Sequence, residues 1–288
     1  MALKRYLRPS NLRVRLVVGL ALAVVFCLQC SQTQANRSSQ FVTAVGGNSV
    51  GEQPGAVVNE LERLARTDHV ALLKKALEHC QQNYQDYTCT FIKQERVNGQ
   101  LGPEQWIDVK FMEKPFSVAM HWVKNAPLGD RMLYVDGKYN NQMLIQPKGA
   151  LVLLTGGAVV RDPVGKEAMA NTLRPVTMFG FRNTLANLLM VYERATRRGE
   201  SQTRFVGYGD VAGHRALVLE RVLPQKNNYP AKLTLWYLDV ERLVPLGMKA
   251  YDWDDQLICS YLYKDVKLNL GLGEKDFIPE ANDIKVKK

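Results

Sequence analysis

The chain has 288 residues, of which 46% are hydrophobic and 23% charged, the proportions of an ordinary globular protein rather than a disordered or collagen-like one. Five of its 38 basic residues lie in the first 35 positions, which contain no acidic residue, so the remaining 33 exceed the 28 acidic ones by only five. This mild excess does not indicate nucleic-acid binding, and the absence of a second long apolar stretch excludes a multi-span membrane protein.

The first 35 residues have the pattern of an export signal peptide. Residues 1–15 are basic and residues 16–28 are almost purely apolar. The apolar stretch would rise only about 20 Å as a helix, short of a hydrocarbon core of about 30 Å. Thr33 and Ala35 place small residues at both key positions of a cleavage site, which predicts cleavage after Ala35 and a periplasmic or secreted mature protein. An uncleaved anchor and a lipid on Cys30 are the alternatives, although Cys30 lacks the small preceding residue that lipidation requires.

Residues 36–56 are rich in Ser, Gln, Gly and Asn and are expected to form a flexible leader. Asp68 is a good N-cap for a helix that runs to about Asn83. Three cysteines remain beyond the signal, in an oxidising compartment. A Cys80–Cys89 disulfide would close a ring of about ten residues and stabilise by roughly 2.5–3 kcal/mol. Buried thiols at Cys80, Cys89 and Cys259 fit the sequence equally well.

From Tyr87 onward the apolar period changes to two, which indicates strands. Asn98-Gly99 and Asp136-Gly137 are hairpin signals, and the connections are too short for parallel crossovers. A second amphipathic helix is expected over Arg182–Ala195. The strands are expected over residues 87–97, 104–113, 116–122, 131–135, 141–146, 203–208, 216–223, 231–239, 243–253 and 256–266.

These elements predict one α+β domain over residues 57–274, followed by a basic tail, 275–288. Eight to eleven antiparallel strands would form one large curved sheet, a half-open barrel, because a sheet of this size tends to curl. The helices would cover its concave face and enclose an apolar interior.

No motif in the chain proposes a reaction. There is no G-x-S-x-G, Walker A, G-x-G-x-x-G or H-E-x-x-H, and the four histidines lack metal-ligand spacing. The acidic cluster Asp252, Asp254 and Asp255 is read as a solvated turn. We therefore predict no catalytic residue, no metal, no cofactor and no enzymatic activity.

The informative feature is a surplus of large apolar side chains on the predicted sheet, because few helices are available to cover them. Uncovered apolar surface on an exported protein usually binds something. The predicted cavity residues are Phe91, Val109, Phe111, Val118, Met120, Trp122, Leu189 and Trp236.

Two runs of the sequence, YTCTFIKQERVNG from Tyr87 and WIDVKFMEKPFSV from Trp106, resemble the secreted bacterial family known as domain of unknown function 1571. The resemblance extends from about Leu72 to Leu268. More distantly, the chain is similar to the LolA/LolB lipoprotein-carrier superfamily, whose motif positions are occupied here by Phe91, Gln94, Lys114-Pro115 and Phe116.

The LolA resemblance implies an unclosed antiparallel barrel with a helical lid around a hydrophobic cavity, in proteins that carry or sense acyl chains in the cell envelope. LolA-type carriers hold the lid with an inward arginine on an early strand, for which Arg96 and Arg131 are the candidates here. Release of cargo would require the lid, Arg182–Ala195, to move.

We therefore predict an exported cell-envelope protein that binds lipid or lipoprotein acyl chains, with peripheral contact to the membrane. Its partners would be a lipid or an acylated protein, and not a nucleic acid. The alternative is an envelope protein–protein interaction or sensory module without cargo, in which edge strands pair with a partner.

Overall fold

The computed structural model describes residues 56–127 and 129–286. The predicted signal peptide, 1–35, and all but the last residue of the predicted leader, 36–56, lie outside the described residues. The described part belongs to one compact unit.

The described residues begin with two helices, α2 (Ala56–Thr67) and α3 (His69–Asn83). Asp68 separates them because its carboxylate accepts a hydrogen bond from the Ala71 backbone N–H at 2.9 Å, which satisfies one of the unpaired donors at the start of α3. The predicted N-cap and the predicted end of this helix are both confirmed.

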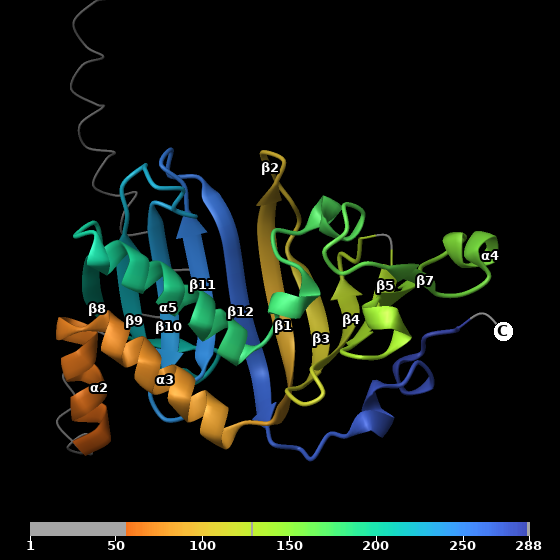
Figure 1. The fold of residues 1–288 in the computed structure, drawn as a ribbon, viewed down its shortest axis with the longest axis horizontal. Helices are drawn as coiled ribbons and strands as arrows, with labels where there is room; N and C mark the ends of the chain where they lie inside the picture. Colours follow the sequence, from red (N-terminus) through yellow and green to blue (C-terminus); the bar gives the residue numbers. More distant parts are fainter. Residues whose placement is uncertain (1–55, 128, 287–288) are drawn as a thin grey trace, which may run out of the picture. The chain divides into compact units, whose positions relative to one another are not determined.

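Twelve antiparallel strands form a single open sheet (Figure 1). Its order along the sheet is β7-β6-β5-β4-β3-β1-β12-β11-β10-β9-β8, with the short β2 paired to β1. The strands are β1 (Asp86–Val97), β2 (Gln100–Leu101), β3 (Gln105–Met112), β4 (Ser117–Lys124), β5 (Gly129–Val135), β6 (Met143–Pro147), β7 (Val159–Arg161), β8 (Gln202–Val211), β9 (His214–Val222), β10 (Leu233–Asp239), β11 (Pro245–Tyr251) and β12 (Leu257–Leu268).

Strand β1 joins the two halves of the chain. Phe91 is paired with Ile107 of β3 on one side and with Tyr263 of β12 on the other. At the end of β1, Asn98 and Gly99 both have positive φ angles, 51° and 80°, as a two-residue hairpin turn requires. The predicted antiparallel meander is therefore confirmed. The last strand, β12, pairs with β1 and so joins the N-terminal strands to the C-terminal ones.

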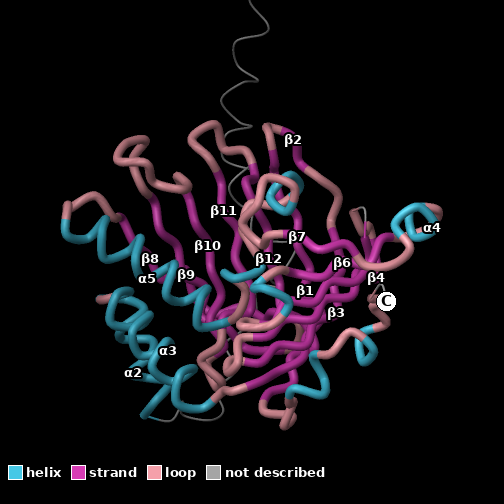
Figure 2. Tube along the Cα trace, turned by 45° about the vertical axis from the view of Figure 1, so that its right-hand side comes forward, coloured by secondary structure: helices cyan, strands magenta, loops and turns pink. Residues whose placement is uncertain are grey.

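The long helix α5 (Phe181–Arg197) and α3 lie across strands β8 to β12 on one face of the sheet (Figure 1). Helix α5 buries Leu185, Leu188 and Tyr192 on that side. The curvature of the sheet, visible in Figure 2, turns this face inward. The predicted class, α+β with a large curved antiparallel sheet and helices on its concave face, is confirmed.

The C-terminal segment packs on the opposite, outer face, which corrects the predicted domain end at residue 274. Phe277 is only 1% exposed, and it shares a hydrophobic cluster with Leu133, Leu144 and Ile284. Backbone atoms also pair, since the Ala158 N–H donates to the Lys285 carbonyl at 2.7 Å. Residues 275–286, predicted as a basic tail, are therefore part of the folded domain.

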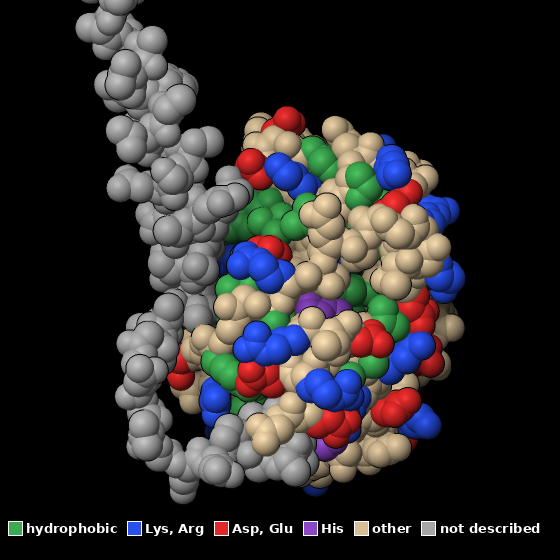
Figure 3. All heavy atoms as spheres, turned by 90° about the vertical axis from the view of Figure 1, so that its left-hand side faces the viewer, with side chains coloured by type: hydrophobic (Ala, Val, Ile, Leu, Met, Phe, Trp, Pro, Cys, Tyr) green, Lys and Arg blue, Asp and Glu red, His purple; other side chains and the backbone are tan. Residues whose placement is uncertain are grey.

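The exposed edge strand β8 carries side chains that take part in polar and charged contacts. Arg204 pairs with Glu220 at 2.9 Å, and Tyr208 donates to Glu62 of α2 at 2.7 Å. Figure 3 shows acidic and basic side chains interspersed over this face of the molecule. Edge strands of this kind resist pairing with further strands.

The three cysteines of the described chain are free and buried, so the Cys80–Cys89 disulfide is not formed. The Cys80 thiol donates to the Leu243 carbonyl, with the sulfur 3.5 Å from the oxygen. Burial raises the pKa of Cys80 to about 12 and raises that of Cys89 as well, so both act as small apolar groups.

Candidate functional site

A cavity of about 620 Å³ lies on the concave face of the sheet. Strands from β12 through β1 to β7 all contribute to its wall, so the sheet curls around it. This volume is within the range of small-molecule sites in proteins.

Aromatic rings and methionines dominate the wall. Phe91 is central, with its ring centre 4.9 Å from that of Tyr263, 5.3 Å from that of Phe179 and 5.5 Å from that of Tyr261. The apolar lining from the strands comprises Phe91, Ile107, Met120, Trp122, Met132, Met143, Ile145, Pro147, Val159, Tyr261 and Tyr263. Because methionine side chains are flexible and unbranched, such a wall adapts to a ligand of variable shape.

An irregular segment, residues 161–179, covers the cavity. It contains two short 3₁₀ turns, Ala168–Asn171 and Val176–Met178, and no longer helix. The cover ends at Gly180, whose φ of +107° and closeness to Phe111 exclude a side chain, since a Cβ there would lie 2.8 Å from the ring. Helix α5, predicted as the lid, begins beyond this glycine and contributes only Thr184 to the lining.

A polar network anchors the cover to the wall. The Glu95 carboxylate accepts hydrogen bonds from Tyr261 at 2.5 Å, from Lys93 at 2.9 Å and from the Thr172 hydroxyl at 3.0 Å. The Leu173 backbone N–H reaches the same carboxylate at 3.4 Å. Strands β1 and β12 thus hold residues 172 and 173 of the cover in place.

The Glu95 side chain is almost fully buried, and its residue is 7% exposed. Desolvation alone would raise the pKa of this carboxyl, but the Lys93 charge and the hydrogen bonds from Tyr261, Lys93 and Thr172 outweigh it and hold the pKa below its ordinary value. Glu95 is therefore ionised at neutral pH and has its oxygen atoms occupied by donors.

One end of the cavity carries an apolar projection. Helix α4 (Leu151–Thr155) stands out beyond the edge strand β7 in both Figure 1 and Figure 2. Leu151 and Thr155 line the cavity, whereas Leu153 and Leu154 are 86% and 83% exposed. Exposed leucines beside an apolar cavity suggest a surface that contacts something apolar.

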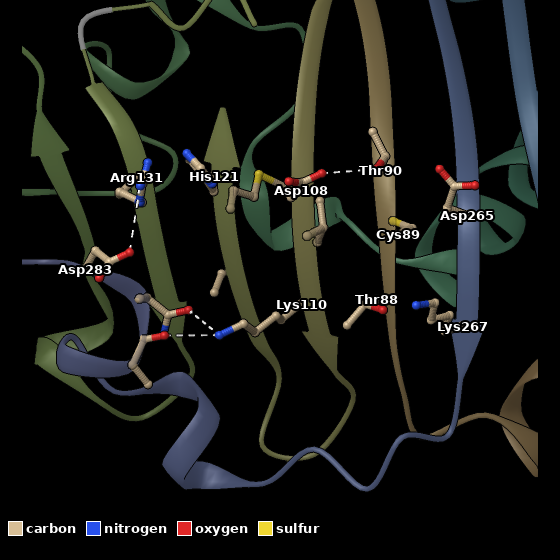
Figure 4. A pocket seen from close by; sticks show the side chains of 15 residues that line it. Thr88, Cys89, Thr90, Asp108, Lys110, His121, Arg131, Asp265, Lys267 and Asp283 are labelled. Carbon is tan, nitrogen blue, oxygen red and sulfur yellow. Dashed lines mark hydrogen bonds and ion pairs between the residues drawn. The ribbon is translucent and has the colours of Figure 1, made fainter. Parts of the chain in front are cut away.

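A second, polar hollow of about 400 Å³ lies on the outer face (Figure 4). Lys110 donates to the Ala281 carbonyl and to Asn282, both at 3.1 Å, and Arg131 lies 3.8 Å from Asp283. These contacts seat the C-terminal segment at one side of the hollow.

The model of the family described as "Protein of unknown function (DUF1571)" matches residues 84–286, more than half of the chain. The chain belongs to this family. No curated protein matches the chain.

This DUF1571 chain is similar to several solved structures at low identity. A DUF1329 family protein from Desulfovibrio piger is 13% identical with a TM-score of 0.38, over 75% of this chain and 100% of that one. The MucA/MucB complex of Pseudomonas aeruginosa is 18% identical with a TM-score of 0.44, over 77% of this chain and only 64% of that one, less than two thirds. A LolA superfamily protein from Nitrosomonas europaea is 10% identical with a TM-score of 0.31, over 73% and 98%.

Three of the eight predicted cavity residues of this DUF1571 protein, Phe91, Met120 and Trp122, line the cavity. Trp122 is held by a hydrogen bond from its indole N–H to Gln105, at 2.8 Å. The other five do not line it. Val109, Phe111, Val118 and Trp236 are buried in the core, and Leu189 is partly exposed on α5.

Trp236 was predicted to line the cavity, and its surroundings explain why it does not. It is fully buried under α5, where its indole N–H donates to the Tyr192 hydroxyl at 2.9 Å. The cavity ends at β12, so a tryptophan on β10 belongs to the half of the sheet that the helices cover.

Neither arginine predicted to hold a lid reaches the cavity. Arg96 donates to the Leu257 and Gly99 carbonyls at the β1 hairpin, and Arg131 faces the outer hollow. The arginines that line the cavity are Arg161 and Arg174, on the covering segment. The sequence of this segment has no helical or strand period. Its irregular pattern was the only sign in the sequence that it forms neither a long helix nor a strand.

No helix among the described residues has the length and apolar character needed to cross a membrane. Within residues 56–127 and 129–286, no cluster of three His, Cys, Asp or Glu side chains is arranged to hold a metal ion. The acidic group near residue 254 is a turn, in which the Asp252 carboxylate accepts from the backbone N–H groups of Asp254 and Gln256.

Proposed function

We propose that this protein is exported to the cell envelope and binds the acyl chain of a lipid or lipoprotein in the concave cavity. The observation that carries the proposal is the apolar wall, in which Phe91, Ile107 and Met120 belong to a continuous surface of rings and aliphatic groups. Each methylene buried there would contribute about 0.8 kcal/mol.

The exposed leucines of α4 support the same role. Leu153 and Leu154 lie at the end of the cavity, where Leu151 of the same helix lines it. A short apolar helix that dips into a bilayer would bring the cavity entrance to the acyl chains. The predicted signal peptide is consistent with this location.

The proposal is tested by filling the cavity. Ile145 lines the wall from β6, so Ile145→Trp should occupy the ligand volume and weaken binding of a fluorescent 18-carbon fatty acid by at least about tenfold. Val206→Trp, at an exposed position on the edge strand β8, is the matched control and should bind normally. Thermal unfolding of both variants verifies that they are folded. Equal binding by both variants, or no uptake by the unmodified protein, would contradict the proposal.

The second candidate, an interaction module without cargo, is favoured by the same exposed leucines, which could dock on an envelope protein. The two functions differ in the cavity. Delipidated protein that takes up no acyl chain, and that cross-links through α4 to one stoichiometric partner, would favour the interaction module.

A further inference from the structure

The charged groups of the cavity are not balanced. Its lining contains Lys93, Glu95, Arg161, Glu167 and Arg174. Lys93 pairs with Glu95 at 2.9 Å, and Arg161 pairs with Glu167 on the cover. Arg174 has no hydrogen bond or ion pair from its side chain within the part of the chain that the structure describes. The lining therefore carries one uncompensated positive charge.

The position of Arg174 is set by the polar network. Its carbonyl accepts from the Thr172 hydroxyl at 3.3 Å, and Thr172 is itself held by Glu95 at 3.0 Å. Pro175 follows immediately and restricts the backbone on the other side. The guanidinium carbon lies 5.4 Å from the centre of the Tyr261 ring, at the polar edge of an otherwise apolar wall.

The half-buried Arg174 guanidinium presents five N–H donors that no protein group among the described residues accepts from, and an anion would pair with it. Glu95 cannot do so at little cost, because Tyr261, Lys93 and Thr172 already occupy its oxygen atoms. An anion on a bound ligand would form charge-assisted, bidentate hydrogen bonds with the guanidinium.

We propose that Arg174 binds the headgroup of the ligand, and that the cavity selects an acyl chain ending in a single carboxylate or phosphate. This inference rests on the proposed function, since it names the ligand class of the same cavity. A neutral amphiphile leaves Arg174 unsatisfied, and a cationic one is repelled by it.

The test is competition against a bound fluorescent neutral chain by hexadecanoic acid, hexadecyl phosphate, methyl hexadecanoate and hexadecylamine. The unmodified protein should bind the acid or the phosphate at least about tenfold more tightly than the methyl ester, and the amine least. A preference for the phosphate over the acid would point to phospholipid headgroups, and the reverse order to free fatty acids.

Arg174→Gln should remove the preference for anions while leaving binding of the methyl ester unchanged, and Arg174→Lys should restore part of it. The matched control is the double variant Arg204→Gln/Glu220→Gln, which removes a charge pair between β8 and β9, outside the cavity lining, and should retain the preference.

Two results would overturn the inference, and they are distinguishable. Equal binding of acid and ester, or a preference that survives Arg174→Gln, refutes the headgroup role while the acyl-chain function stands. Failure of every chain to bind, including the neutral probe, refutes the proposed function and the headgroup role with it.

Discussion

At the scale of single residues, Glu95 is the residue that holds the cover of the cavity on the sheet. Its carboxylate is buried, ionised and bonded to groups from β1, β12 and the cover. Removing one partner of a buried ion pair leaves the other charge uncompensated, and such changes are strongly destabilising. The network therefore explains how an irregular cover without long helices stays on the sheet.

We predict that Glu95→Gln lowers the free energy of unfolding at pH 7 by about 2–4 kcal/mol. Because the folded-state pKa of Glu95 lies below its ordinary 4.5, its carboxylate stabilises the fold above that pH, and this contribution is lost as pH falls through the folded-state pKa. The difference between the two proteins should therefore stay constant near neutral pH and shrink as the pH falls below 4.5, as measured by urea unfolding.

The control is Glu193→Gln, which removes a partly exposed partner of Lys74. Pairs of this kind contribute about 0–1 kcal/mol, so that variant should show a small loss. A Glu95→Gln penalty that is no larger than that of Glu193→Gln, or that does not change with pH, would contradict the role assigned to the network.

At the scale of elements, the molecule divides its helices between two tasks. Helices α2, α3 and α5 belong to the half of the sheet that contains β8 to β12, where residues such as Leu185 and Tyr192 are buried. The short helix α4 buries little and projects from the other half. The cavity lies mostly in the half without long helices and reaches β12 at its border with the other half.

The exposed leucines of α4 are predicted to contact a membrane surface. The double variant Leu153→Ser/Leu154→Ser should sediment at least about tenfold less with phosphatidylethanolamine–phosphatidylglycerol vesicles, because two inserted leucines would each contribute about 1.5–3 kcal/mol. Its unfolding free energy should change by less than about 0.5 kcal/mol, since both side chains are exposed.

Met190→Ser provides the comparison, because Met190 is an exposed apolar residue on α5, away from the cavity lining. It should sediment like the unmodified protein. If the leucine variant sediments normally, or if Met190→Ser reduces sedimentation equally, α4 is not a membrane-contact element.

At the scale of the whole molecule, the regular elements were predictable because each carries its own local signal. The Asp68 cap, the Asn98-Gly99 turn and the alternating strands of the meander all appear in the structure where the sequence indicates them. Local propensity and tertiary packing agree at these positions.

The cavity was only partly predictable, because a period of two tells which side chains share a face but not what covers that face. Phe111 and Met120 are both apolar strand residues, yet Phe111 is packed beneath Gly180 and Met120 lines the cavity. The cover, residues 161–179, is held by side-chain contacts to Glu95 that no sequence period encodes. The docking of Phe277 depends likewise on contacts between residues far apart in the chain.

The central claim, that an acyl chain occupies the concave cavity, is tested most directly by photo-cross-linking. Delipidated protein would be irradiated with a 16-carbon fatty acid that carries a diazirine at its midpoint, and the labelled peptides mapped by mass spectrometry. We predict labels on β3, β4 and the cover, 161–179, and their loss when unlabelled hexadecanoic acid competes. Labels confined to the outer hollow near residue 282, or labels that competition does not reduce, would contradict the account.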